Sequence, residues 1–275
     1  MSQWLKTKVK NYYYHDQTLV MGILNVTPDS FSDGGNYTTI EKAIQQAQQM
    51  QAQGAHIIDV GGESTRPGHE PVPEAEEIDR IKPVIKELSK HLSVPISIDT
   101  SKAAVAKAAL EAGASIINDI WGAKKEPEIA KVAAQYDAPI ILMHNRDNKE
   151  YQSLIDDVIK DLQESVDIAL AAGVKHEHII LDPGVGFAKT YEDNLNVMRR
   201  LDKIKSLGYP ILLGTSRKSF IGLTLDLPVD LRDEGTGATV CYGLMKGVEV
   251  VRVHNVEMTY RMTKMMDCLM EKGDQ

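Results

Sequence analysis

The feature that most constrains the fold is an eightfold alternation of short apolar runs with longer segments of helical periodicity. The short runs are rich in Val, Ile and Leu and are apolar nearly throughout, which is typical of parallel strands buried on both faces. The predicted strands are residues 19–25, 56–61, 95–100, 115–119, 139–144, 178–182, 210–214 and 249–254.

The intervening segments repeat apolar residues at the spacing of an amphipathic helix. In the first of them, Thr38 and Glu41 have the spacing of a capping box. Eight strand–helix units in one chain predict a (β/α)8 TIM barrel, and an open doubly wound sheet is the competing architecture. The predicted helices are residues 38–53, 74–91, 101–112, 128–136, 154–172, 192–207, 237–245 and 256–270.

The chain is expected to form a single domain over residues 1–275. Apolar residues make up 43% of the 275 positions, which is enough for one large core, and no low-complexity linker divides the sequence. Residues 1–18 precede the first unit and are interpreted as a peripheral N-terminal extension.

Composition excludes several classes of protein. The net charge of −8 lacks the basic footprint of a nucleic-acid-binding protein, although it leaves room for a local anion site. No apolar run approaches the ~20 residues of a membrane helix, and the N-terminus has no secretory apolar region. Cys241 and Cys268 form no metal or redox motif. We therefore expect a cytoplasmic protein with no nucleic-acid or membrane partner.

Each predicted strand ends in polar residues. In a (β/α)8 barrel the carboxyl ends of the strands share one face, where active sites are built. Some of these residues have a simpler interpretation as helix caps, namely Ser101, Asp119 and Thr190. Capping does not explain Arg252 and His254, which alternation places on one face of a strand, where a buried cation needs a partner or an anion. The strand-end residues are Asn25, Asp59, Asp99, Asn118, Asp119, His144, Asp182, Thr215, Ser216, Arg252 and His254.

Familiar catalytic and nucleotide-binding motifs are missing from the sequence. The run from Gly184 to Gly186 begins like a dinucleotide fingerprint, but Lys189 occupies the third glycine position. The sequence has no P-loop, H-E-x-x-H, C-x-x-C or G-x-S-x-G motif. The loop around Arg66 suits a phosphate, because an Arg fork lies among glycines. Taken alone, that loop fits a plain turn equally well.

Eight motifs, in order from Met21 to Asn255, together resemble bacterial dihydropteroate synthase. They read MGILNVTPDSFSDGG, DVGGESTRPG, SIDT, IINDI, MHN, LDPGVGFAKT, TSRKSF and RVHN. Members of that family are (β/α)8 barrels that condense 6-hydroxymethyl-7,8-dihydropterin pyrophosphate with p-aminobenzoate. The products are 7,8-dihydropteroate and pyrophosphate, a step in folate biosynthesis, and sulfonamides compete with p-aminobenzoate.

The resemblance implies a pterin site at the strand ends. It assigns catalytic roles to Asp33, Lys218 and Arg252, with Asp33 facing a pterin cation formed by ionisation before attack. Asp182 would accept a pair of N–H groups from the pterin edge, and Arg252 would stack on the ring. The pterin-binding residues implied are Asp99, Asn118, Met143, Asp182, Gly214, Lys218 and Arg252.

The resemblance also implies sites for pyrophosphate and p-aminobenzoate. Mg²⁺ is the implied cofactor, with Asn25 as its ligand, because Mg²⁺ takes oxygen ligands and keeps several waters. Two of the three Phe would sandwich the flat substrate ring, and Phe220 would support the loop behind Lys218. The implied pyrophosphate residues are Asn25, Arg66, Arg252 and His254, and the p-aminobenzoate residues are Phe31, Thr65, Pro67, Phe187, Lys218 and Ser219.

Two alternatives share the pterin pocket with this reading. One is a pterin-dependent methyltransferase barrel, which has no reason to keep Phe31, Asp33, Arg66 and Pro67; the other is a non-catalytic pterin-binding barrel, expected to lose Asp33, Lys218 or Arg252. We expect small-molecule substrates, sulfonamide inhibitors and a homodimer. The methionines of the last predicted helix suit an interface or plain packing equally well.

Overall fold

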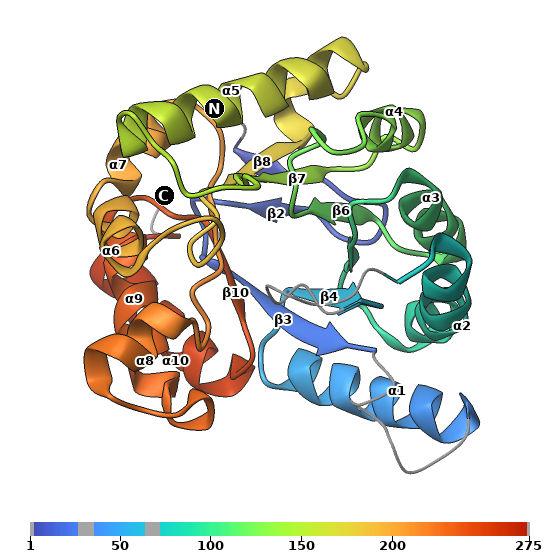
Figure 1. Ribbon diagram of the computed structural model, residues 1–275. Coiled ribbons are helices and arrows are strands. Elements are labelled where there is room, and N and C mark those ends of the chain that lie inside the picture. Colours follow the sequence, from blue (N-terminus) through green and yellow to red (C-terminus); the bar gives the residue numbers. More distant parts are fainter. Residues whose placement is uncertain (1–2, 27–35, 64–71, 274–275) are drawn as a thin grey trace.

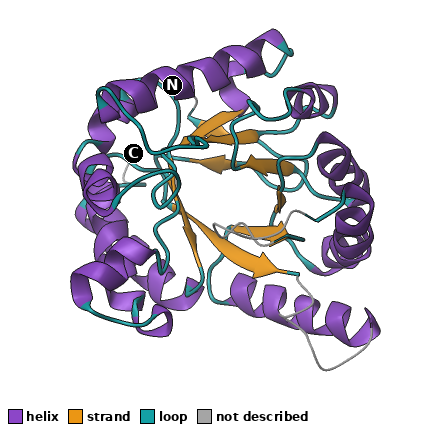
Figure 2. Cartoon of the chain, viewed as in Figure 1, coloured by secondary structure: helices purple, strands orange, loops and turns teal. Residues whose placement is uncertain are grey.

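The computed structural model describes residues 3–26, 36–63 and 72–273, which form a barrel of parallel strands surrounded by helices (Figure 1). Figure 2 shows the strands gathered at the centre and the helices around them. The strands are β3 (Leu19–Asn25), β4 (Ile57–Gly61), β5 (Ile96–Asp99), β6 (Ile116–Asp119), β7 (Ile140–Met143), β8 (Ile179–Asp182), β9 (Leu212–Leu213) and β10 (Val250–Val253).

The sheet closes on itself. Its strands follow the order β8-β7-β6-β5-β4-β3-β10-β9, and every pairing in it is parallel. A parallel bridge between Leu181 and Ile211 joins the two outer strands of that order. The predicted (β/α)8 TIM barrel is therefore confirmed, and the open sheet is excluded.

The helices bury one face against the sheet, as their periodicity predicts. The helices are α1 (Asn36–Ala52), α2 (Glu74–His91), α3 (Ala103–Ala112), α4 (Glu128–Gln135), α5 (Leu154–Ala171), α6 (Tyr191–Arg199), α7 (Leu201–Lys205), α8 (Ser219–Leu225), α9 (Asp233–Met245) and α10 (Val256–Leu269), with 3₁₀ turns η2 (His176–His178) and η3 (Val229–Leu231).

Several local predictions are wrong. Helix α1 begins at Asn36, so Thr38 lies inside the first turn and is not the capping residue. The N-cap of α3 is Lys102 and not Ser101, whereas Thr190 caps α6 in a reciprocal pair with Asp193 as predicted. The predicted helix 192–207 is divided into α6 and α7 at Arg200, whose φ of −115° interrupts the helix.

Other differences concern short elements. Helix α8 was not predicted, because its seven residues are too few for a periodic pattern to stand out. Strand β9 has two residues where five were predicted, and α9 begins at Asp233, four residues before the predicted start at Gly237.

The barrel interior is built in layers that follow the two-residue period of the strands. The lower layer is apolar and belongs to one buried cluster that also contains residues of the N-terminal segment. The barrel residues of this cluster are Leu19, Met21, Ile57, Ile116, Ile141, Ile180, Leu212 and Val250, and those of the N-terminal segment are Leu5, Tyr12 and Tyr14. Two residues further along these strands come Asp59, Asn118, Met143, Asp182, Gly214 and Arg252. The polar strand ends therefore form the layer directly above an apolar floor.

The described part of the N-terminal extension lies against the lower layer. Strands β1 (Trp4–Leu5) and β2 (Tyr12–Tyr13) form an antiparallel hairpin. Leu5, Tyr12 and Tyr14 of this segment are buried and share a cluster with the apolar barrel residues. The hydroxyl of Tyr12 donates to the carbonyl of His56, directly before β4, at 2.9 Å. The hairpin thus closes the end of the barrel opposite the polar strand ends.

Candidate active site

Arg252 is held by two carboxylates at the centre of the polar layer. Its Nε donates to Asp59 Oδ2 at 2.6 Å, and its Nη2 donates to Asp99 Oδ2 at 2.7 Å. Asn118 also donates to Asp59 Oδ2, at 3.1 Å. Arg252 lies on β10, Asp59 on β4, Asp99 on β5 and Asn118 on β6. Closure of the barrel therefore brings these four residues together. The prediction that a buried cation here needs a partner is confirmed, because two acidic side chains hold it.

Asp99 keeps a free acceptor. Its Oδ1 is buried and has no hydrogen-bond partner among the described residues, and the same is true of Asp59 Oδ1. Burial raises the pKa of Asp99 to about 7; Arg252 acts against this rise, and Asp59 adds to it. A buried acceptor without a donor is costly, so Asp99 Oδ1 is suited to accept an N–H group from a bound molecule.

Asp182 ends β8 with its carboxylate pointing to the same layer. Its Oδ1 accepts the backbone N–H of Gly184 at 2.7 Å, which fixes the carboxylate at the start of the following loop. Burial raises the pKa of Asp182 to about 6, against the opposing effects of the Gly184 hydrogen bond and the charges of Lys218 and Arg252. The carboxylate is therefore ionised at neutral pH and available as an acceptor.

A small enclosed cavity lies among these side chains. Its volume is about 20 Å³, which is room for about one water molecule. A flat bicyclic ring would enter it only after side chains move apart, a rearrangement that is common on ligand binding. The cavity is lined by Asn118, Ile120, Met143, Asp182, Val185, Phe187, Gly214, Lys218 and Arg252.

Lys218 and Phe187 line the cavity and contact each other. The Nζ of Lys218 lies 4.0 Å from the centroid of the Phe187 ring, a cation–π contact. A Cβ at Gly186, whose φ is +87°, would lie 2.8 Å from Lys218 Cδ, so glycine allows the lysine to lie across the loop. Burial lowers the pKa of Lys218 to about 8, with Arg252 adding to the effect and Asp182 opposing it.

His254 lies beside Ser216 and is neutral at physiological pH. The backbone N–H of His254 donates to Ser216 Oγ at 3.1 Å, and the Ser216 hydroxyl lies 2.8 Å from His254 Nδ1. The Ser216 oxygen can accept two hydrogen bonds, so its contact with Nδ1 is compatible with either neutral tautomer of His254. Burial lowers the pKa of His254 to about 4, helped by Arg217 and Arg252. His254 can thus act as a neutral hydrogen-bond partner.

The neighbours of His254 have structural roles. Arg217 binds both oxygens of Asp233, at 2.7 and 2.9 Å, and Asn255 donates to Asp233 Oδ2 at 2.9 Å. Asn255 also caps α10, accepting the N–H of Met258. The two Asp119 oxygens accept the backbone N–H groups of Trp121 and Ala123, so this carboxylate holds the turn after β6. Asp119 was predicted as a possible helix cap, and its carboxylate instead caps the turn after β6.

Four predicted site residues within the described ranges do not line the enclosed cavity, namely Asn25, Asp99, Ser219 and His254. Ser219 is exposed at the start of α8 and lines an open outer groove with Leu223, Asp226 and Arg232. Asn25 is exposed at the end of β3. Five predicted residues lie outside the described ranges: Phe31, Asp33, Thr65, Arg66 and Pro67.

The described residues fit Mg²⁺ only as a loosely held ion. Among residues 3–26, 36–63 and 72–273, no group of three or more His, Cys, Asp or Glu side chains is arranged to hold a metal. The exposed amide of Asn25 supplies one oxygen beside Gly61, at the carboxyl ends of β3 and β4. One protein oxygen suffices for a Mg²⁺ that keeps its waters and takes its other ligands from substrate phosphates.

Three features of the site were missed from the sequence. Asp59 was recognised as a polar strand end but received no role, although it holds both Arg252 and Asn118. Ile120 and Val185 line the cavity without any polar signal. Asp59 and Arg252 are 193 residues apart, so their pairing depends on closure of the barrel. No pattern in the neighbouring sequence indicates it.

Comparison with known proteins identifies the family of this chain. The profile of the family described as "Pterin binding enzyme" matches residues 21–254. The chain belongs to this family of pterin-binding enzymes and, within it, to the dihydropteroate synthases. A curated relative of that name from Bacillus subtilis (strain 168) is 59% identical over 272 residues, which cover 99% of this chain and 95% of the relative.

Two solved structures are similar over nearly the whole chain. Dihydropteroate synthase from Clostridium difficile, determined in the presence of pteroic acid, has a TM-score of 0.92 and 50% identity, covering 94% of this chain and 98% of that one. The enzyme from Xanthomonas albilineans with 4-aminobenzoic acid has a TM-score of 0.92 and 36% identity, covering 98% and 99%. Within the described ranges, no helix combines the length and apolarity needed to cross a membrane.

Proposed function

We propose that this protein condenses 6-hydroxymethyl-7,8-dihydropterin pyrophosphate with p-aminobenzoate to give 7,8-dihydropteroate and pyrophosphate. The observation that carries the proposal is the polar layer of the barrel. There Asp182, Asn118, Arg252 and Lys218 border the cavity, and Asp99 holds Arg252 from outside its lining. Buried acceptors beside two cations suit a ring that has N–H groups on one edge and a pyrophosphate on its side chain.

The pterin is placed with its N–H edge toward the carboxylates. Asp182 accepts the paired donors, Asn118 binds the adjacent edge, and Asp99 accepts through its unpartnered Oδ1. Arg252 stacks on the ring, because its planar guanidinium is held in position by Asp59 and Asp99. Met143 provides an apolar surface, Gly214 leaves room beside the ring, and Lys218 reaches the ring carbonyl and N5 region.

The reaction is a substitution at the exocyclic methylene. The bond from the methylene carbon to the pyrophosphate oxygen breaks first, and the dihydropterin delocalises the resulting cation. Asp33 faces that cation, the amine of p-aminobenzoate attacks it, and the new secondary amine loses a proton. No covalent enzyme intermediate is needed.

Positive charge and donors stabilise the leaving pyrophosphate. Arg66 and Arg252 supply charge, and His254 is a neutral hydrogen-bond partner. Mg²⁺, with Asn25 as its protein ligand, would neutralise charge on the phosphate oxygens. Because the chain as a whole carries a net charge of −8, this positive charge must be local.

The p-aminobenzoate ring is placed against Phe187, with Phe31 and Pro67 on its other side. Its carboxylate binds Ser219 and nearby backbone N–H groups, Thr65 orients the second loop, and Lys218 lies between the two substrates. The cation–π contact of Lys218 with Phe187 supports this arrangement, since it places the lysine against the aromatic surface. Sulfonamides would compete for the same surface.

A homodimer and a cytoplasmic location belong to the proposal. Large apolar side chains are exposed on α8, α9, α10 and η3, with Leu223 at 69%, Met245 at 71% and Leu269 at 65% exposure, which supports an interface on this side. Cys241 and Cys268 are both free thiols, as a reducing compartment maintains. Sedimentation equilibrium tests the dimer directly.

The test of the activity is formation of dihydropteroate from the two substrates with and without Mg²⁺. We expect product and pyrophosphate in equal amounts, with sulfonamide competitive against p-aminobenzoate. A well-folded preparation that forms no dihydropteroate would overturn the proposal. Methyl transfer to a corrinoid protein in the same preparation would favour the methyltransferase alternative.

A further inference from the structure

The loop between β8 and α6 carries cavity residues on a strained backbone. Val185 and Phe187 line the cavity, while Gly184, Gly186 and Ala188 have positive φ values of 66°, 87° and 46°. Ala188 is the costly member of this set, because a side chain disfavours the left-handed region. A backbone of this kind persists only where its surroundings hold it.

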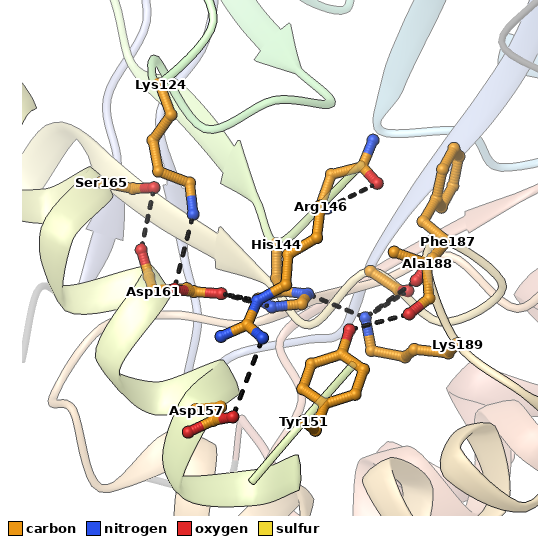
Figure 3. Close-up of polar contacts among 12 residues, drawn as sticks. Lys124, His144, Arg146, Tyr151, Asp157, Asp161, Ser165, Phe187, Ala188 and Lys189 are labelled. Carbon is orange, nitrogen blue, oxygen red and sulfur yellow. Dashed lines mark hydrogen bonds and ion pairs between the residues drawn. The ribbon is translucent and has the colours of Figure 1, made fainter. Parts of the chain in front are cut away.

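Lys189 holds this loop from inside the protein. Its side chain is buried, with 5% exposure, and its Nζ lies 3.0 Å from the Gly184 carbonyl and 3.1 Å from the Phe187 carbonyl. The third contact is His144 Nδ1 at 2.8 Å (Figure 3). Three acceptors match the three N–H donors of an ammonium group, so the geometry is satisfied when Lys189 is protonated.

His144 connects Lys189 to a carboxylate on α5. His144 Nε2 lies 3.0 Å from Asp161 Oδ2, so Nε2 carries the proton and Nδ1 is the acceptor for Lys189. Burial lowers the pKa of His144 to about 4, which keeps the ring neutral. Although burial opposes ionisation of Asp161, hydrogen bonds from His144 and Arg146 lower the pKa of that carboxyl, which therefore stays charged.

The same group of residues supports the loop at a further point. The hydroxyl of Tyr151 donates to the Ala188 carbonyl at 2.8 Å, and Arg146 stacks on the Tyr151 ring at 4.6 Å. Arg146 also donates to Asp161 at 2.6 Å (Figure 3). The carbonyls of Gly184, Phe187 and Ala188 are thus all fixed by side chains, and none of these supporting side chains lines the cavity.

We propose that Lys189 is a positioning residue for p-aminobenzoate, holding the Phe187 loop in its binding conformation through a Lys189–His144–Asp161 relay. The inference rests on the proposed function, because it takes Phe187 as the surface for the p-aminobenzoate ring. Asp182 is fixed separately by the Gly184 N–H. Loss of the relay should therefore affect p-aminobenzoate more than pterin.

The charge on Lys189 makes the relay sensitive to pH. Burial lowers the pKa of Lys189 to about 7, with Arg146 adding to this effect, while Asp182, Asp193 and Asp161 oppose it. His144, also in contact, is neutral in this range. As the pH rises above about 7, Lys189 loses a donor, and one of its three acceptors, Gly184 O, Phe187 O or His144 Nδ1, loses its partner, which weakens the support of the loop. The KM for p-aminobenzoate should then rise.

The first experiment compares Lys189→Met with the unaltered protein. Met keeps the length of the side chain and removes the donors, so we expect the KM for p-aminobenzoate to rise about tenfold or more. We expect the calorimetric dissociation constant for the pterin to change by less than about threefold. Lys175→Met is the matched control, because Lys175 is exposed before β8 and pairs with Asp137 on the surface; it should behave as the unaltered protein does.

A second pair of variants separates positioning from simple packing. In His144→Asn the amide oxygen takes the place of Nδ1 and can accept from Lys189, whereas in His144→Gln the amide nitrogen takes the place of Nε2 and reaches only Asp161. We expect His144→Gln to raise the KM for p-aminobenzoate more than His144→Asn does. A packing role would rank the two by volume lost, which is greater for Asn, and would reverse this order.

The pH profile gives a readout that a structural role would not move. The KM for p-aminobenzoate of the unaltered protein should rise above about pH 7, whereas that of Lys189→Met should be high and independent of pH. A folded Lys189→Met variant with an unchanged KM would overturn the inference, and so would equal losses for both substrates. If the unaltered protein itself forms no dihydropteroate, the proposed function has failed instead.

Discussion

The guanidinium of Arg252 donates through Nε to the carboxylate of Asp59 at 2.6 Å, and Asp59 is completely buried. The same carboxylate oxygen accepts from Asn118 at 3.1 Å. Asp59 therefore fixes a cation and an amide that border the cavity without lining it itself. Since both neighbours are proposed to contact the pterin, we expect Asp59 to act as a positioning residue for that ring.

Asp59→Asn should weaken pterin binding and lower stability. Asn keeps the shape but loses the charge that pairs with Arg252, so we expect the free energy of unfolding to fall by about 1–3 kcal/mol and the pterin dissociation constant to rise about tenfold. Denaturant unfolding and calorimetry measure the two effects. Asp202→Asn is the control, because Asp202 is exposed beside Lys246 and should change stability by less than about 0.5 kcal/mol. Unchanged pterin affinity in Asp59→Asn would contradict the assignment.

The layer of polar strand ends that forms the site follows from the two-residue alternation of side chains along each strand. Apolar residues such as Ile180 and Val250 precede Asp182 and Arg252 by two positions, so both members of each pair face the barrel interior. Such a pattern predicts which residues meet at one end of the barrel. It does not predict which of them pair, because the contacts join distant strands.

Loop conformations could be predicted much less well. Lys189 was treated only as the residue that breaks a glycine fingerprint, and His144 had no role, yet they are in contact across 45 positions. Whether a lysine is buried depends on the paths of two loops, which periodicity does not describe. The capping prediction at Thr38 failed for a similar reason, since helix α1 begins two residues earlier than the apolar pattern indicates.

Pterin affinity should depend on Asp182 and on its ionisation. Asp182→Ala removes the proposed acceptor of the paired N–H groups, and we expect affinity to fall at least about a hundredfold in calorimetry. Burial raises the pKa of Asp182 to about 6, so the carboxylate loses its charge as the pH falls through that value. Affinity of the unaltered protein should fall with it, whereas Asp182→Asn should lack this acid limb. Full affinity in Asp182→Ala would remove Asp182 from the site.

Asp33→Ala should separate binding from turnover. Asp33 is assigned by resemblance to face the pterin cation and lies outside the described residues, so we expect pterin affinity to persist while kcat falls about a hundredfold or more. Calorimetry and steady-state rates measured on one preparation provide the comparison. The assignment fails if pterin affinity is lost and turnover remains normal.

Phe187→Leu should affect p-aminobenzoate more than pterin. Leu keeps an apolar side chain but removes the flat ring, and with it the surface that Lys218 contacts at 4.0 Å. We expect the KM for p-aminobenzoate and the sulfonamide inhibition constant to rise about tenfold, with the pterin dissociation constant changing by less than about threefold. Equal changes for all three ligands would count against placing p-aminobenzoate on Phe187.

Gly184→Ala should be among the most damaging single substitutions in the barrel. A Cβ at Gly184 would lie 2.0 Å from the carbonyl oxygen of His144, and the φ of +66° already disfavours alanine. Because the Cβ is fixed directly to the backbone and the His144 carbonyl is itself backbone, the segment after β7 and the β8–α6 loop must move apart, at an expected cost of about 4 kcal/mol or more. Gly208→Ala is the matched control, since its φ of +85° imposes the same kind of strain with nothing within 4 Å, and about 1–2 kcal/mol is expected there. Denaturant unfolding of both variants measures the difference, and similar losses for the two would show that the approach of Gly184 to His144 is not tight.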